Sequence, residues 1–279
     1  MKLQRYLIEG RTQSLPKDEF EKLLRTDYRD SVMSVINGKG MLFRGNKDTP
    51  QYGYVDTSKG KLRRSANTSN EYTLCIDNSS RWKNYPRRGR SLICSTSLLY
   101  AINYGHLNIV LPINGSSIGI CSDDDFWYSF PYIEKVLHIR DMDSFNSEFR
   151  DLLRWGTGNR TNDKNWAQLR SAMKEFDKKF ENYNYDWDNV FSEIYSGINY
   201  TKSASAWDDA WKGSLQKTIN DIIDPVNNEF KLVNIGDQFD DDCEAWFSGK
   251  SLVINTNYFG DKGEYEKTLN YLMSVMEGH

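Results

Sequence analysis

Ser91-Leu92-Ile93-Cys94-Ser95-Thr96-Ser97 is the stretch that organises this chain, because an apolar run leads directly into three hydroxyl side chains. A short apolar run bounded by turn signals is typical of a buried strand. We therefore predict a strand that ends at the hydroxyl residues, with Cys94 as a small core residue.

Similar apolar segments occur before and after this stretch. Asn114-Gly115 and Ser248-Gly249-Lys250 each stand between two of them, and both are expected to form hairpin turns. The early and late strands are expected to pair into one mixed or antiparallel core. The other predicted strands cover residues 41–43, 108–111, 118–120, 230–235, 244–247 and 251–254.

Apolar residues at steps of three and four predict helices in three parts of the chain. The first helix begins at Pro16 and is stopped by Asn37-Gly38. A helical insertion follows at about residues 143–224, where Trp207 to Ile222 form one continuous stripe, and a closing helix lies around 265–276. The predicted fold class is α+β: one domain over residues 1–279 with a β core, an N-terminal helix and a helical insertion.

The composition is that of an ordinary water-soluble protein, with 38 % hydrophobic residues, 27 % charged residues and a formal net charge of -3. That charge confines any nucleic-acid contact to a local patch. Four cysteines without a CxxC pair disfavour a zinc site and favour a reducing compartment. The first ten residues lack a long apolar run, so we expect a cytoplasmic protein that does not enter a membrane.

Three short clusters, far apart in the chain, carry the residues best suited to chemistry. Arg44-Gly45 ends the first predicted strand, and Ser95 to Ser97 end the strand quoted above. Asp242-Cys243-Glu244 leads into a late strand. Side chains two apart on a strand share a face, so Asp242 and Glu244 are expected to point one way and Cys243 the other.

The ordered set of arginine, Ser-Thr-Ser and carboxylate-x-glutamate resembles the arginine–serine–glutamate signature of ADP-ribosyltransferases. Segments within residues 85–105 and 244–250 also look like members encoded by bacteria and their phages. The resemblance covers about residues 41–130 and 230–256. It implies a split mixed or antiparallel β core, NAD as the co-substrate, no metal, and transfer of ADP-ribose to a macromolecule.

The resemblance also implies roles for individual residues. Arg44 would bind phosphate or ribose oxygens, and Gly45 would let the backbone approach the nicotinamide amide. Ser95 would hydrogen-bond the nicotinamide ribose or orient Glu244. The rest of the expected NAD site consists of Thr96, Ser97, Tyr100 and Tyr104. The two tyrosines would stack on the nicotinamide.

Breaking the nicotinamide–ribose bond develops positive charge on the sugar, which an ionised Glu244 would stabilise. Asp242 would orient or deprotonate the acceptor, although arginine-modifying members carry a glutamate there, one methylene longer. By resemblance, residues 122–130 correspond to a phosphate–nicotinamide loop. Residues 236–241 correspond to an acceptor loop, with Phe239 as its exposed aromatic.

A basic segment precedes the Ser-Thr-Ser strand. Residues 81–90 contain five cations and two aromatics, and Arg63 and Arg64 add to them. Such a mixture binds phosphates, either those of NAD or those of a nucleic acid. We assign Arg87 and Arg88 to acceptor binding, which slightly favours a nucleic acid, RNA before DNA, over a protein acceptor.

Other interpretations stay open. Water as the acceptor would make the protein an NAD glycohydrolase, and the basic segment alone would make it a non-enzymatic nucleic-acid-binding module. Asp123-Asp124-Asp125 is a weak metal signal, because consecutive residues on a regular element do not all face one ion. Members from bacteria and phages are often toxins or effectors of host–phage conflict. The sequence leaves three roles open for the helical insertion: a partner-docking surface, an antitoxin site or a lid that positions the acceptor.

Overall fold

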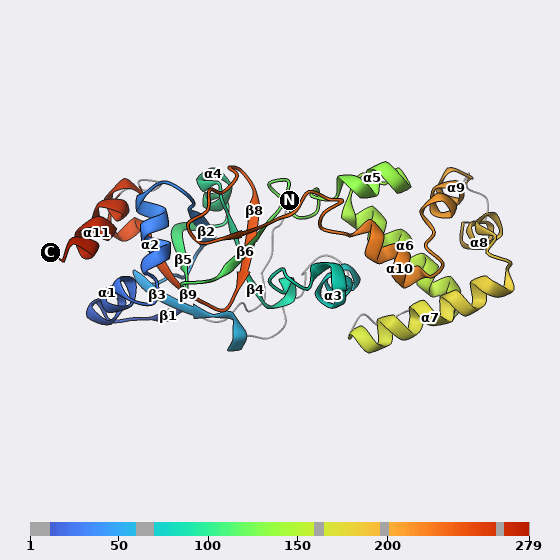
Figure 1. The fold of residues 1–279 in the computed structure, drawn as a ribbon, viewed down its shortest axis with the longest axis horizontal. Helices are drawn as coiled ribbons and strands as arrows, with labels where there is room; N and C mark the ends of the chain where they lie inside the picture. Colours follow the sequence, from blue (N-terminus) through green and yellow to red (C-terminus); the bar gives the residue numbers. More distant parts are fainter. Residues whose placement is uncertain (1–11, 60–69, 159–164, 196–200, 261–264, 279) are drawn as a thin grey trace. The chain divides into compact units, whose positions relative to one another are not determined.

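The computed structural model describes residues 12–59, 70–158, 165–195, 201–260 and 265–278. Within these ranges the chain forms eleven α-helices and one nine-stranded antiparallel sheet (Figure 1). The expected combination of helices with an antiparallel core is confirmed. The first ten residues, Arg63 and Arg64 lie outside the described ranges.

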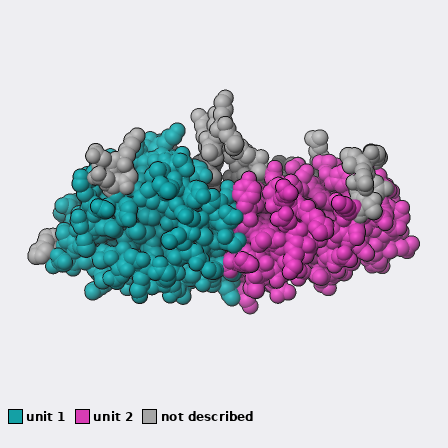
Figure 2. All heavy atoms as spheres, turned by 90° about the horizontal axis from the view of Figure 1, so that it is seen from above, with its two compact units in different colours: residues 1–64, 84–125, 231–279 teal, residues 65–83, 126–230 magenta. Residues whose placement is uncertain are grey.

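The chain divides into two compact units, coloured separately in Figure 2. The sheet unit holds residues 1–64, 84–125 and 231–279, and the helical unit holds 65–83 and 126–230. The helical unit is therefore wider than the insertion expected at 143–224. It also takes in α3 (Glu71–Asn78) and α5 (Pro131–Leu137).

Strands from both ends of the chain alternate in the sheet, whose order is β1-β3-β9-β5-β2-β4-β8-β6-β7. β9 lies between β3 and β5, and β8 lies between β4 and β6, which confirms the predicted pairing of early with late strands. The strands are β1 (Gln13–Ser14), β2 (Leu42–Asn46), β3 (Tyr52–Asp56), β4 (Ser91–Ser95), β5 (His106–Pro112), β6 (Ser117–Ile120), β7 (Lys231–Asn234), β8 (Glu244–Ser248) and β9 (Lys250–Asn255).

Both predicted hairpins are wrong, although both turns exist. Gly115 and Gly249 take positive φ angles of 77° and 110°, which favour glycine. However, β5 pairs with β2 and β9, whereas β6 pairs with β7 and β8. Likewise β8 pairs with β4 and β6, while β9 pairs with β3 and β5. Each turn therefore carries the chain between the two halves of the sheet, which are β1-β3-β9-β5-β2 and β4-β8-β6-β7.

The two halves of the sheet meet at β2 and β4, where the described strands share one Cα pair, Phe43 with Ser95. One face of the sheet packs on α1 (Lys17–Arg25), α2 (Arg29–Ile36) and α11 (Glu266–Glu277), as Figure 1 shows. Phe20 and Leu272 are among the side chains in this contact. The other face gathers apolar side chains from both halves, including Phe247, into a single cluster. That cluster spans the β2–β4 junction, which lies in the middle of the strand order.

The predicted N-terminal helix is split into α1 (Lys17–Arg25) and α2 (Arg29–Ile36). Asn114 accounts for the break, because its side chain donates to the Thr26 carbonyl and accepts from the Asp30 amide, both at 3.0 Å. These bonds satisfy backbone groups that a helix end would otherwise leave unpaired. The predicted stop is confirmed, since α2 ends at Ile36 and Gly38 takes a φ of 65°.

The helical unit has an aromatic core that includes Phe176, Phe180 and Trp187. The stripe predicted from Trp207 to Ile222 is not continuous, because Gly213 takes a φ of 80° and Ser214 caps a new helix. The remaining helices of this unit are α6 (Met142–Thr157), α7 (Trp166–Asn182), α8 (Trp187–Ile194), α9 (Thr201–Ala210) and α10 (Leu215–Ile222).

Glu148 of α6 makes the stability of the protein depend on pH. Burial raises the pKa of its carboxyl from 4.5 to about 7, although a hydrogen bond from the Trp207 indole at 3.0 Å opposes the shift. A raised folded-state pKa contributes stability that is fully present below pH 4.5 and is lost as the pH rises toward 7.

Glu148→Gln keeps an acceptor oxygen for Trp207 and removes the buried charge. We expect the variant to match the wild type near pH 4.5 and to be more stable by roughly 2 kcal/mol at pH 8. Urea unfolding at both pH values measures the difference. Glu181→Gln, at an exposed position of α7, is the control and should change neither curve.

Candidate functional site

Ser95 and Glu244, the hydroxyl and carboxylate residues of the sequence signature, lie opposite each other on neighbouring strands. Ser95 is the Cα partner of Glu244 across β4 and β8, and it is also the partner of Phe43 across β4 and β2. Directly paired residues of antiparallel strands point to the same side of a sheet. Ser95 and Glu244 therefore share one face, at the point where the two halves of the sheet join.

Arg44 stands one residue beyond this row on β2. Alternation along the strand directs its side chain to the face opposite Ser95. Its guanidinium donates a hydrogen bond to the carbonyl of Ile93 in β4. Ile93 lies beyond Phe43 and Ser95, the one residue pair that joins the described strands β2 and β4. Arg44 therefore fastens the junction of the two sheet halves within which Ser95 and Glu244 lie.

Gly45 is required by the protein's own packing. A Cβ built on this residue would lie 2.0 Å from the carbonyl oxygen of Ala101 and 2.8 Å from Cβ of Tyr104. Ala101 belongs to α4 (Leu98–Ile102), the short helix that follows the Ser-Thr-Ser turn. The absent side chain thus lets α4 sit directly on β2.

The Ser-Thr-Ser turn holds the segment that precedes β8. The Thr96 amide donates to the Cys243 carbonyl at 2.9 Å, and the Cys243 amide donates to the Thr96 hydroxyl at 2.9 Å. The Ser95 hydroxyl accepts from the amide of Ser97 at 3.0 Å, and Ser97 is buried. Ser95 and Thr96 therefore tie the strand carrying the hydroxyl to the chain carrying the carboxylate.

The predicted strand position of Asp242 is wrong. β8 begins at Glu244, and Asp242 lies before it in a turn with a φ of 59°. Its side chain is exposed, and strand alternation does not extend to it because it lies outside β8. Cys243 does point away from that face, since it is buried in the apolar cluster that contains Phe247.

Glu244 forms an ion pair with Arg88. The Arg88 guanidinium lies 2.5 Å from the Glu244 carboxylate oxygen, and the two side chains are only 5 % and 17 % exposed. The guanidinium carbon also lies 5.5 Å from the ring centroid of Trp246. The Trp246 indole donates to the carbonyl of Pro86 at 2.9 Å, which holds the segment before Arg88 against β8.

The ion pair revises the interpretation of the basic segment. Arg88 is buried beside the candidate carboxylate, whereas Arg87 is exposed. Arg81 belongs to the helical unit, where it forms an ion pair with Asp224 at 3.2 Å. The segment 81–90 is therefore divided between the two units and is not one continuous exposed basic patch.

The two loops expected from the resemblance differ from the prediction. Phe239 is buried rather than exposed, because its ring lies over Gly40, where a Cβ would come within 2.6 Å of it. Within residues 122–130, the Asp123 carbonyl accepts from the Glu244 amide at 3.0 Å. Phe126 and Phe130, however, pack in the core of the helical unit.

Three carboxylates and a tyrosine lie close to the Ser-Thr-Ser turn. A hydrogen bond with Asp124, together with the charges of Asp242 and Asp123, raises the pKa of the exposed Tyr100 phenol. Burial and the neighbouring Asp124 raise the pKa of Asp123. Among the described residues, no group of His, Cys, Asp or Glu side chains could hold a metal ion.

No family model, curated protein or solved structure matches this chain. In the part of the chain that the structure describes, no helix has the length and apolar character needed to cross a membrane. The four cysteines are all buried and unbridged.

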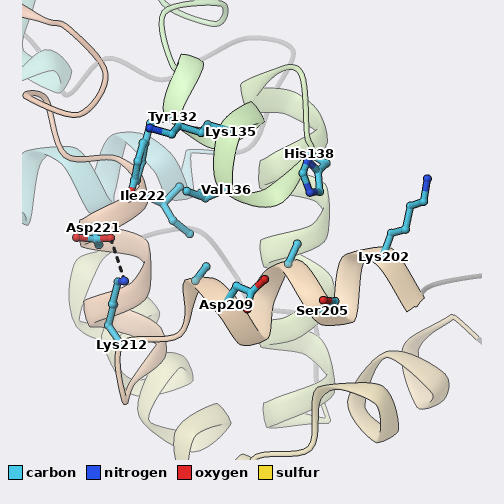
Figure 3. A pocket seen from close by; sticks show the side chains of 12 residues that line it. Tyr132, Lys135, Val136, His138, Lys202, Ser205, Asp209, Lys212, Asp221 and Ile222 are labelled. Atoms are coloured by element: carbon cyan, nitrogen blue, oxygen red, sulfur yellow. Dashed lines mark ion pairs between the residues drawn. The ribbon is translucent and has the colours of Figure 1, made fainter.

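The helical unit contains a separate cavity of about 940 Å³, shown in Figure 3. Lys135, His138 and Lys202 line it together with Asp209 and with an ion pair of 3.7 Å between Lys212 and Asp221. None of its lining residues belongs to the predicted site. Its mixed charges favour no single class of ligand.

Proposed function

We propose that this protein is an NAD-dependent ADP-ribosyltransferase that modifies a macromolecule. The observation that carries the proposal is the direct pairing of Ser95 with Glu244, next to the strand that bears Arg44. These are the residue types and chain order that the sequence resemblance requires. The proposal includes an ADP-ribosyltransferase-like arrangement of the two sheet halves.

In the proposed reaction the bond between the ribose C1′ and the nicotinamide nitrogen breaks, and nicotinamide leaves with the electron pair. Positive charge then grows on the ribose, and the Glu244 carboxylate stabilises it. The acceptor nucleophile bonds to C1′ and loses its proton to a base, for which the exposed Asp242 is the nearest candidate in sequence.

Arg88 supports this role of Glu244. The Arg88 guanidinium donates a hydrogen bond to Glu244 Oε1 and thereby holds the carboxylate in one orientation. Ser95 presents its hydroxyl on the same face of the sheet as Glu244. Arg44 acts from the opposite face, where it holds β2 to β4 through the Ile93 carbonyl.

The test uses purified protein, NAD labelled in its adenosine part, and cell lysate, followed by digestion with protease or nuclease. We expect label in macromolecules and release of nicotinamide that depends on the lysate. Rapid nicotinamide release without lysate, and with no label transferred, would instead indicate an NAD glycohydrolase. Absence of both signals would indicate that the protein is a non-enzymatic nucleic-acid-binding module.

A further inference from the structure

The segment that follows the Ser-Thr-Ser turn exposes an unusual amount of apolar surface. Leu99 is 69 % exposed and Ile102 is 41 % exposed, both on α4, and Tyr100 and Tyr104 are also exposed. Single exposed apolar residues are common, but a group of four within six residues marks an interaction surface. We refer to these four side chains as the α4 surface.

The α4 surface is held rigidly in place. Ala101 is buried, and the α4 backbone approaches Gly45 so closely that a Cβ there would lie 2.0 Å from the Ala101 carbonyl oxygen. The exposure of these side chains is therefore not the result of a loosely attached helix. A rigid apolar surface loses little conformational entropy when a partner covers it.

Negative charge borders this surface. Asp124 hydrogen-bonds Tyr100, and the charges of Asp123 and Asp242 act on the same phenol. One of these carboxylates, Asp242, lies only two residues before the candidate catalytic Glu244. Charges of one sign beside an apolar patch select a partner segment of the opposite sign.

We propose that the α4 surface docks a protein acceptor through a segment that combines apolar and basic side chains, an inference that rests on the proposed function. Apolar groups of the acceptor cover Leu99 and Ile102, and its lysine or arginine side chains face Asp124 and Asp242. The docked segment is thereby brought beside Glu244. The binding surface and the reacting group belong to the same sheet unit.

The charges disfavour a nucleic-acid acceptor at this surface. Phosphates would approach Asp123, Asp124 and Asp242, and the repulsion between like charges opposes that approach. Two cations that the sequence offered for phosphate binding are already engaged, Arg88 with Glu244 and Arg81 with Asp224.

The experiment measures binding without NAD, by fluorescence anisotropy. The probes are a short labelled peptide of alternating leucine and arginine, a matched peptide of leucine and glutamate, and single-stranded oligouridine. We expect the wild-type protein to bind the arginine peptide most tightly. The double variant Leu99→Ser/Ile102→Ser should weaken that binding about tenfold, because it removes the apolar contacts.

Met273→Ser is the matched control, since Met273 is an exposed apolar residue on α11 of the same unit. It should leave peptide affinity unchanged. Asp124→Asn/Asp242→Asn should weaken binding and reduce its dependence on salt. Tighter binding of oligouridine or of the glutamate peptide, or equal affinity of wild type and Leu99→Ser/Ile102→Ser, would overturn the proposal.

Because no NAD is present, this result does not depend on whether ADP-ribose is transferred. Failure of peptide binding would therefore refute the docking proposal alone, whereas absence of nicotinamide release by the wild type in the presence of lysate would refute the proposed function.

Discussion

Glu244→Gln is expected to lower the rate of ADP-ribose transfer by about a thousandfold, because it removes the negative charge that stabilises the ribose cation. Glutamine keeps the shape of the side chain and an acceptor oxygen for Arg88. The measurement is the initial rate of transfer to lysate acceptors. A variant that retains wild-type rates would exclude Glu244 from the chemistry.

The same substitution has a structural cost that must be separated from the chemical one. The Arg88 side chain is 5 % exposed, and without its partner it is a buried and uncompensated cation. We expect Glu244→Gln to reduce the free energy of unfolding by about 2 kcal/mol, and Arg88→Met to reduce it by about 3 kcal/mol.

The double variant Arg88→Met/Glu244→Gln separates the two effects. Replacing both charges by neutral groups of similar volume removes the unpaired charge, so stability should return to within about 1 kcal/mol of the wild type. Transfer should stay at the level of Glu244→Gln. Recovery of transfer in the double variant would mean that Glu244→Gln loses activity through misfolding and not through the missing carboxylate.

Gly45→Ala is expected to destabilise the protein by about 3 kcal/mol, the second large effect. The added Cβ would lie 2.0 Å from the Ala101 carbonyl oxygen, and backbone cannot yield as a flexible side chain does. α4 would have to move, and the Ser-Thr-Ser turn at its start would move with it. Thermal and urea unfolding measure the loss.

Gly115→Ala is the control for Gly45→Ala. Gly115 has no atom within 4 Å of the position of a Cβ, so only its φ of 77° opposes alanine, at a cost of about 1 kcal/mol. Equal stability losses in the two variants would show that α4 does not lie against β2 as described.

The elements of the sheet could be predicted from the sequence, but the partners of several strands could not. The apolar runs that form β4, β5, β8 and β9 are local signals, and so are the turns at Gly115 and Gly249. A turn signal fixes the direction of the chain but does not fix which strand comes next in the sheet. The partners depend on the apolar cluster that contains Phe247, which joins residues far apart in sequence.

The same distinction applies to the candidate site. Ser95 and Glu244, each at the end of its own strand, pair directly, whereas the Arg44 side chain points to the opposite face of the sheet. The burial of Arg88 could not be predicted, since it depends on a carboxylate 156 residues away. The exposure of Phe239 was expected from the resemblance alone, yet Gly40 leaves a space that the ring fills.

The central claim is that the Glu244 carboxylate serves transfer of ADP-ribose to a macromolecule. The most direct test is mass spectrometry of cellular protein and RNA after expression of the wild type, of Glu244→Gln and of Arg88→Met/Glu244→Gln. We expect ADP-ribose adducts on protein with the wild type and none with either variant. Adducts at equal abundance in all three samples, or none in any of them, would contradict the account.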